Sequence, residues 1–160
     1  MGVSEYLDWL EHTSWAEAIR QSLWLYPALE IVHILGIVIL VGPAFLFDLF
    51  LLGFSKNLPF AGMARYLLPW SRRGLILIIP SGLFLFITNA ETLGFDPTFW
   101  LKMVLLAVAG LNALVFHKFV SRGKLDPNTP PKIPLLYKIQ ALVSISVWIA
   151  VISCGRLLAY

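Results

Sequence analysis

Charged residues are scarce in this sequence. Asp, Glu, Lys and Arg make up 13% of the 160 residues, whereas about a quarter of the residues in a typical soluble domain are charged. Hydrophobic residues account for 59% of the chain. This composition excludes an ordinary soluble fold and predicts an integral membrane protein.

Cysteine is almost absent as well. The single Cys154 excludes an internal disulfide and a CxxC redox pair. The sequence also lacks a phosphate-binding glycine loop, paired carboxylates at glycosidase spacing and a Ser-His-Asp arrangement. The acidic start, residues 1–12, predicts no cleaved signal peptide. These patterns indicate no particular class of enzyme.

Charge is missing altogether from four long runs. These runs are 31–47, 74–90, 103–116 and 139–155. Each is close to the roughly 20 apolar residues that cross a bilayer. We therefore expect an all-α, four-helix membrane bundle that forms a single domain over residues 1–160. The predicted spans lie at about 22–48, 72–91, 98–118 and 136–157.

The start of the chain predicts a short amphipathic surface helix. Its apolar side chains fall on one helical face: Val3, Tyr6, Leu7 and Leu10. Ser14 followed by Glu17 fits a capping box. We expect Ser14 to begin the helix that continues into the first span. The basic segment 55–73, with two prolines, is interpreted as an interfacial elbow.

The basic residues are segregated between the connecting segments. Nine of the twelve Lys and Arg lie between spans one and two or between spans three and four. The other three are Arg20, Lys102 and Arg156. Because cytoplasmic loops carry the excess of Lys and Arg, we expect a bacterial inner-membrane protein with both termini on the periplasmic side. The net charge of +3 is then no indication of nucleic-acid binding, and the expected partner is the lipid bilayer, with other membrane subunits possible.

Polar side chains within the spans mark candidate functional positions, because ionisable groups are costly inside a membrane. Counting along spans one and three, at 1.5 Å per residue, places these groups in two layers about 22 Å apart. The predicted outer layer holds Glu30, His33, Asn89, Lys102, Met103 and Cys154. The predicted inner layer holds Asp48, Arg72, Arg73, Asn112 and His117.

The outer layer suggests a haem b or copper site around His33. A haem bound by His33 and His117 needs spans one and three to slip by more than two helical turns, so His117 is the less favoured ligand. Met103, Lys102 and His12 remain as alternative partners of His33 on a haem iron. A copper site would use His33, Met103 and Cys154, whose soft sulfur ligands favour Cu(I).

The same polar residues also have structural explanations. His33 is equally explained as a buried histidine that is hydrogen-bonded to Glu30, Lys102 or a backbone carbonyl. Glu30 with Lys102 is then an ion pair that locks spans one and three. Asp48 pairs in the same way with Arg72, Arg73 or His117, and Met103 and Cys154 are packing residues. In this interpretation the polar layers set the register of the helices.

Several motifs resemble those of a family of uncharacterised small bacterial four-helix membrane proteins. The motifs are E-x-x-H in span one, G-P and D-x-x-x-L-G at its end, L-L-P-W before span two, and P-x-F-x-L-K, G-L-N and F-H in span three. The residues that carry them are Glu30, His33, Gly42, Asp48, Leu52, Gly53, 67–70, Pro97, Phe99, Leu101, Lys102, Gly110, Asn112 and His117. The chain is more distantly similar to copper-resistance membrane proteins and small cytochromes b.

These observations lead to one main expectation about function. We expect a haem- or metal-binding electron-transfer protein, or such a subunit of a larger membrane complex, with His33 as principal ligand. Glu30 and Lys102 would support that ligand. The alternatives are a non-catalytic accessory or assembly subunit and a copper or proton pathway that joins the two polar layers.

Overall fold

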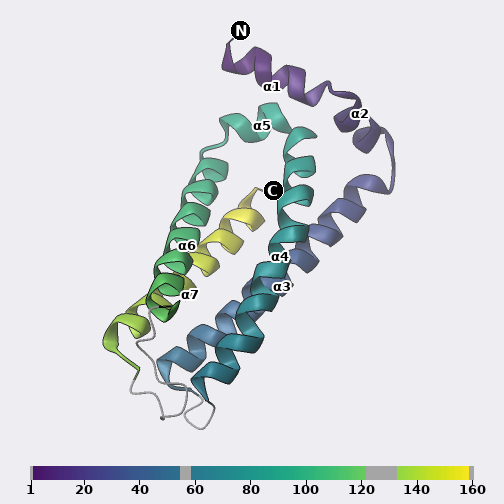
Figure 1. Cartoon of the computed structure of the whole chain (residues 1–160). Helices are drawn as coiled ribbons and strands as arrows, with labels where there is room; N and C mark the ends of the chain where they lie inside the picture. The colour runs from purple at the N-terminus through teal and green to yellow at the C-terminus, as the bar shows by residue number, and fades with distance from the viewer. Residues whose placement is uncertain (1, 55–58, 122–132, 159–160) are drawn as a thin grey trace.

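The computed structural model describes residues 2–54, 59–121 and 133–158 (Figure 1). Within these ranges the chain is all-α, as predicted, and contains no strand. The helices are α1 (Val3–Glu11), α2 (Ser14–Gln21), α3 (Leu25–Leu52), α4 (Phe60–Ile87), α5 (Ala90–Phe95), α6 (Pro97–Ser121) and α7 (Leu135–Leu157). Of these, α3, α4, α6 and α7 are long and apolar enough to cross a membrane.

Large apolar side chains cover the outside of the four long helices. Leu35, Ile76, Leu111 and Leu142 are all more than half exposed. A soluble protein rarely exposes so much contiguous apolar surface, whereas the hydrocarbon of a bilayer solvates such a surface well. The four long helices therefore identify a multi-pass membrane protein.

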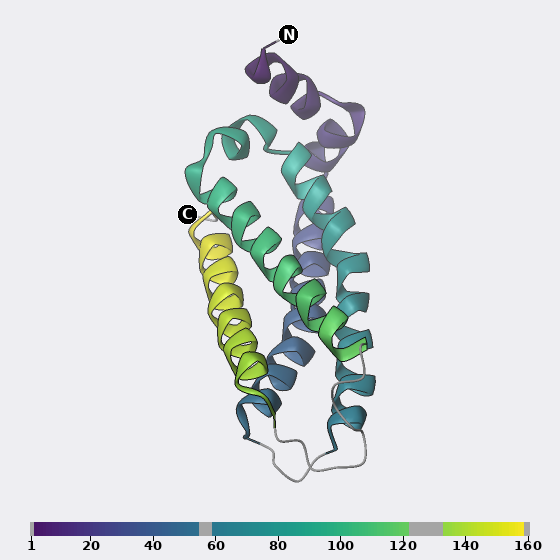
Figure 2. The same ribbon diagram turned by 60° about the vertical axis from the view of Figure 1, so that its left-hand side comes forward.

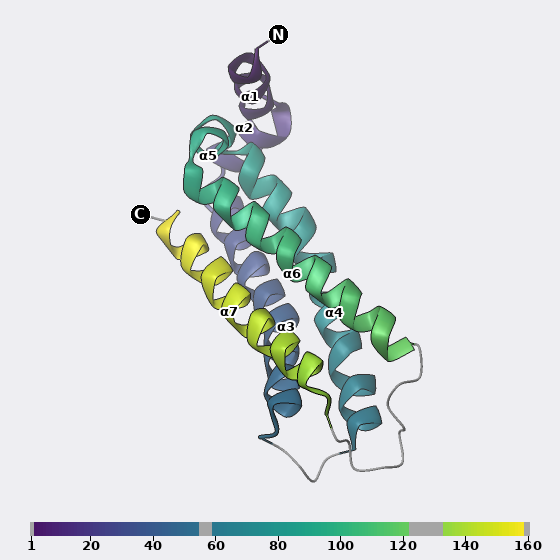
Figure 3. The ribbon, with the colours of Figure 1, turned by 90° about the vertical axis from the view of Figure 1, so that its left-hand side faces the viewer.

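Helix α3 occupies the middle of the bundle. It packs against α4 on one side and α7 on the other, and α6 packs against α7. Figure 1 shows α6 and α4 standing apart, with α7 visible between them. The short helices α1, α2 and α5 lie together at one end, which we call the cap end, and α7 finishes toward this same end (Figures 2 and 3).

Two helix boundaries differ from the sequence prediction. Helix α2 ends at Gln21 and α3 begins only at Leu25, so the helix that starts at Ser14 does not continue into the first span. Its N-cap is Thr13, whose hydroxyl accepts a hydrogen bond from the Ala16 amide, as N-cap residues do. The predicted elbow is, from Phe60 onward, part of continuous α4.

Two glycines allow α3 and α4 to approach closely. A Cβ atom on Gly74 would lie 2.6 Å from the Leu40 amide nitrogen and 2.8 Å from the Gly36 carbonyl oxygen. A Cβ atom on Gly36 would lie 2.7 Å from Ile78 Cγ1. Small residues serve this purpose in membrane helix pairs, where close backbone packing replaces the hydrophobic effect. Ser71 then donates a 2.6 Å hydrogen bond to the Leu40 carbonyl across the interface.

A cluster of aromatic rings forms the core at the other end of the bundle, which we call the aromatic end. It joins α3, α4, α6 and α7 through Phe47, Phe50, Phe60, Phe116 and Tyr137. Phe47 and Phe116 meet edge to face with ring centroids 5.4 Å apart. Such pairs are a favoured aromatic geometry, so this cluster fixes the relative positions of all four spans.

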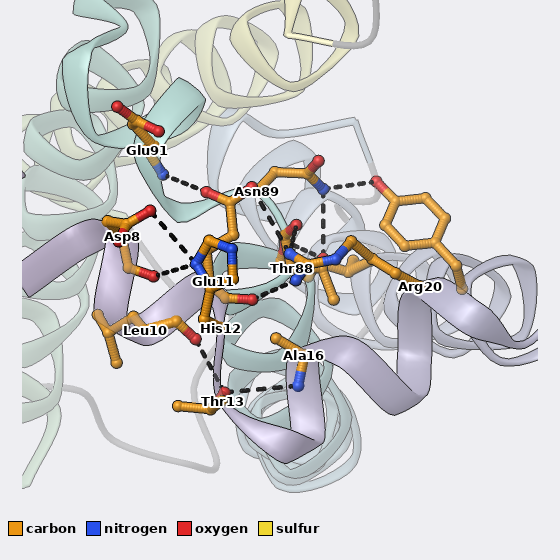
Figure 4. Close-up of polar contacts among 12 residues, drawn as sticks. Asp8, Leu10, Glu11, His12, Thr13, Ala16, Arg20, Thr88, Asn89 and Glu91 are labelled. Carbon is orange, nitrogen blue, oxygen red and sulfur yellow. Dashed lines mark hydrogen bonds and ion pairs between the residues drawn. The ribbon is translucent and has the colours of Figure 1, made fainter.

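Polar contacts attach the N-terminal helices to the cap end (Figure 4). Arg20 donates to the Thr88 carbonyl at 3.1 Å and to the Glu11 carbonyl, and it forms a 3.6 Å ion pair with the Glu11 carboxylate. Glu11 in turn accepts from the Glu91 amide at 2.9 Å. These contacts connect α1 and α2 to the end of α4 and the start of α5.

Helix α1 uses only part of its apolar face to dock. Leu7 is buried and packs against Gly94 of α5, whereas Tyr6 and Trp9 remain more than half exposed.

At the end of α1, a hydrogen bond with the Asp8 carbonyl and the charge of the Asp8 carboxylate raise the pKa of His12.

Gly74→Ala tests the close approach of α3 and α4. The added methyl group would overlap backbone atoms of α3, so we expect a loss of roughly 1–3 kcal/mol in stability, the usual effect of overpacking. The matched control is Gly110→Ala, because nothing lies within 4 Å of the Cβ position in α6. Thermal unfolding in detergent measures both variants, and equal stabilities would contradict the packing described.

Candidate functional site

His33 lies at the interface of α3 and α4. Its Nδ1 atom is 2.9 Å from the Ser81 hydroxyl, and Ser81 is almost fully buried at 2% exposed. Gly82 makes room for the imidazole, since a Cβ atom there would lie 3.1 Å from His33 Cε1. The His33 ring is therefore held against the backbone of α4.

The hydrogen bonds of Ser81 assign the tautomer of His33. A hydroxyl has a single proton to donate, and the Ser81 hydroxyl donates to the Leu77 carbonyl at 2.5 Å. Its oxygen is thus left to accept from His33 Nδ1–H. The Ile78 backbone carbonyl, which can only accept, is a further partner of the His33 ring. In a neutral imidazole with a proton on Nδ1, the Nε2 atom carries a free lone pair.

Lys102 of α6 and Cys154 of α7 complete this site. The Lys102 ammonium is close enough to His33 and to Cys154 to interact electrostatically with each of them. The Lys102 Nζ atom lies 3.8 Å from the Cβ position of Gly155, and Cys154 is buried. We call these residues, one from each span, the histidine site: His33, Ser81, Lys102 and Cys154.

Three other residues of the predicted cofactor site lie outside this group. Glu30 and His117 are exposed, and Met103 is 44% exposed. His117 lies within α6, next to Phe116 of the aromatic cluster, at the opposite end of the bundle from His33. Among the residues that the structure describes, no three His, Cys, Asp or Glu side chains come together as a metal-binding group.

The predicted ion pair between Glu30 and Lys102 is not formed. Glu30 is exposed, and no carboxylate in the described ranges pairs with the Lys102 ammonium. Lys102 is therefore a half-buried cation whose neighbours are an imidazole and a thiol.

Asp48 forms a second polar site near the aromatic end. It is 7% exposed and hydrogen-bonds to Ser144 of α7. The predicted pairing of Asp48 with Arg72, Arg73 or His117 is wrong. Both arginines point outward from α4, and the Arg73 guanidinium lies 4.9 Å from the ring centroid of Trp70.

Neither Ser81 nor Ser144 is among the residues predicted from the sequence to contact His33 or Asp48. A serine in a span that also contains a helix-breaking proline is a usable signal, because its hydroxyl bonds a backbone carbonyl one turn earlier.

A double-mutant cycle tests whether Glu30 and Lys102 interact. We expect Glu30→Gln and Lys102→Met to be additive, with a coupling energy below about 0.5 kcal/mol, as for residues that share no contact. We also expect Lys102→Met to keep or raise the thermal midpoint, because it removes an unpaired cation from a span. Lys138→Met on the exposed side of α7 is the control. A coupling energy of roughly 1 kcal/mol or more would show that Glu30 and Lys102 do form an ion pair.

Comparison with known proteins gives one match. Residues 7–160 match a family of unknown function, DUF6644. No curated protein and no solved structure matches the chain. The predicted similarity to an uncharacterised family is thereby confirmed, and the more distant similarity to copper-resistance proteins and small cytochromes b stays a prediction. The chain belongs to the DUF6644 family of unknown function.

Proposed function

We propose that this protein is a haem- or metal-binding electron-transfer protein of the bacterial inner membrane, or such a subunit of a larger membrane complex. His33 is its principal ligand and binds through Nε2. The positive-inside rule favours both termini on the periplasmic side, which puts the cap end and the nearby histidine site toward that face.

One observation carries this proposal: the His33 ring is held by a hydrogen bond between Nδ1 and the Ser81 hydroxyl, whose own proton goes to the Leu77 carbonyl. Ligating histidines almost always donate their other ring N–H to an acceptor, which fixes the tautomer and turns the lone pair toward the metal.

The neighbours of His33 suit two cofactors. The half-buried Lys102 ammonium, which has no carboxylate partner in the described ranges, would pair with an anionic cofactor such as haem b through its propionates. The buried Cys154 thiol is a soft ligand that suits Cu(I). Either cofactor would supply a one-electron redox centre, while Ser81 orients the ligand and the apolar spans exclude water.

A specific observation favours a second candidate, a non-catalytic accessory or assembly subunit. Helices α4 and α6 meet mainly through side chains, with Phe86 of α4 stacked on Phe99 of α6 at 5.2 Å between ring centroids. Large apolar side chains such as Ile79 and Leu101 are exposed on these two helices. A helix of another subunit would pack against these exposed side chains. The two candidates are compatible, since redox subunits commonly work within larger complexes.

Optical spectra and elemental analysis of the purified full-length protein test the leading proposal. We expect haem b absorption that changes on reduction, or stoichiometric copper, and loss of the cofactor in His33→Ala. Ser81→Ala should weaken the cofactor affinity about 10–100-fold, the usual effect of removing a group that orients a ligand. His117→Ala removes the other span histidine, which lies outside the proposed site, and should retain the cofactor.

A stable protein that is colourless and metal-free, and that takes up neither haemin nor Cu(I), would contradict this proposal. A cofactor that survives His33→Ala would overturn the ligand assignment. Purification in mild detergent tests the second candidate separately, because a partner subunit should co-purify whether or not a cofactor is present.

A further inference from the structure

Two buried oxygen atoms near the aromatic end have no hydrogen-bond partner in the part of the chain that the structure describes. They are Asp48 Oδ2 and Gln140 Oε1. Both side chains are 7% exposed. Buried polar atoms are nearly always hydrogen-bonded, so each exception calls for an explanation.

The two side chains share one neighbourhood. Asp48 of α3 hydrogen-bonds to Ser144 of α7, and Gln140 precedes Ser144 by one helical turn, on the same face of α7. From α6, the Asn112 side-chain amide donates to the Gln140 backbone carbonyl at 3.2 Å. Three helices therefore converge on Asp48 and Gln140, just above the aromatic cluster that contains Phe47.

Among the residues that the structure describes, no charged group pairs with the Asp48 carboxyl. The basic side chains of the surrounding helices are exposed: Arg65, Arg72 and Arg73 on α4, His117 and Lys118 on α6, and Lys138 on α7. The other titratable neighbour, Tyr137 of α7, is buried within the aromatic cluster. In the described ranges Asp48 forms no ion pair, and Ser144 is its hydrogen-bond partner. An isolated carboxylate is very unfavourable in such surroundings.

We propose that Asp48 binds an exchangeable proton on Oδ2 and donates it to Gln140 Oε1, which makes Asp48, Gln140 and Ser144 a proton-binding site inside the membrane. The proton is taken from water as the carboxylate becomes a carboxylic acid. It neutralises the charge and turns Oδ2 from an acceptor into a donor. A single proton thus satisfies both unpartnered oxygens. This site is separate from the histidine site and does not depend on its cofactor.

Infrared spectroscopy of the full-length protein in lipid nanodiscs at neutral pH tests this inference. We expect a carbonyl band of a protonated carboxyl group that moves when aspartate is labelled with 13C at its carboxyl carbon and that shifts in D2O. Asp48→Asn should remove the band. Asp96→Asn is the matched control and should retain it, because the Asp96 carboxylate caps the start of α6 by accepting from the Thr98 amide at 2.6 Å.

Gln140→Leu tests the acceptor. Loss of the hydrogen bond from Oδ2 should move the band to higher wavenumber while leaving it present. If Asp48→Asn does not fold, the 13C label in the wild-type protein and the Gln140→Leu shift still decide the question.

The inference is overturned if no aspartate band of a protonated carboxyl is found, or if the band persists in Asp48→Asn. It is also overturned if the band appears only after sodium is removed, because the oxygens of Asp48, Gln140 and Ser144 would then bind Na⁺ rather than a proton. A band that is insensitive to Gln140→Leu would reject Gln140 as the acceptor.

Discussion

The need to give each polar side chain a partner inside an apolar bundle is the constraint on which this structure depends. Helix α3 carries two such side chains, His33 and Asp48, near opposite ends of one long span. Each bonds to a serine on a different neighbour, Ser81 of α4 and Ser144 of α7. Because α3 must serve both partners, it lies between these helices and sets the order of the bundle.

The packing differs between the two halves of the bundle for the same reason. Toward the cap end, Gly74 and Gly82 remove side-chain volume from α4, which brings backbone and hydroxyl groups within reach of α3. At the aromatic end, Phe47 and Phe116 fill the space between α3 and α6. Aromatic rings offer no strong hydrogen-bonding groups, so Oδ2 of the neighbouring Asp48 has no partner in the described ranges, whereas the His33 ring is bonded to Ser81. The half of the bundle near the cap end therefore holds the proposed ligand His33, and the half near the aromatic end surrounds the Asp48 carboxyl with apolar side chains.

Much of the architecture follows from the sequence because hydropathy and helical rise are local properties. The four long apolar helices and the placement of His33 and Asp48 at different depths come from counting residues. The hydrogen-bond partners of His33 and Asp48 cannot be found by counting residues, since these partners depend on how α4 and α7 are rotated about their axes. A helix that is apolar on all sides gives little sign of its inward face. Glu30, one turn from His33, was expected to face Lys102 and instead faces outward.

The start of α4 shows the opposite difficulty. Its arginines and Pro69 suggested an interfacial segment, yet the helix is continuous and places Arg65 and Arg72 on its exposed side. Local charge was informative about exposure and misleading about secondary structure, because a proline inside a membrane helix is tolerated when neighbouring groups satisfy the backbone.

The proposed function depends on His33 being a neutral imidazole that donates from Nδ1–H to Ser81 and keeps an unprotonated Nε2. Nitrogen-15 NMR of the full-length protein, labelled at histidine and free of added cofactor, tests this most directly. We expect His33 to show a protonated Nδ1 and an unprotonated Nε2, and we expect Ser81→Ala to disturb this pattern. A proton on Nε2, with Nδ1 accepting from Ser81, would contradict it, because the lone pair would then point at the serine and not at a ligand.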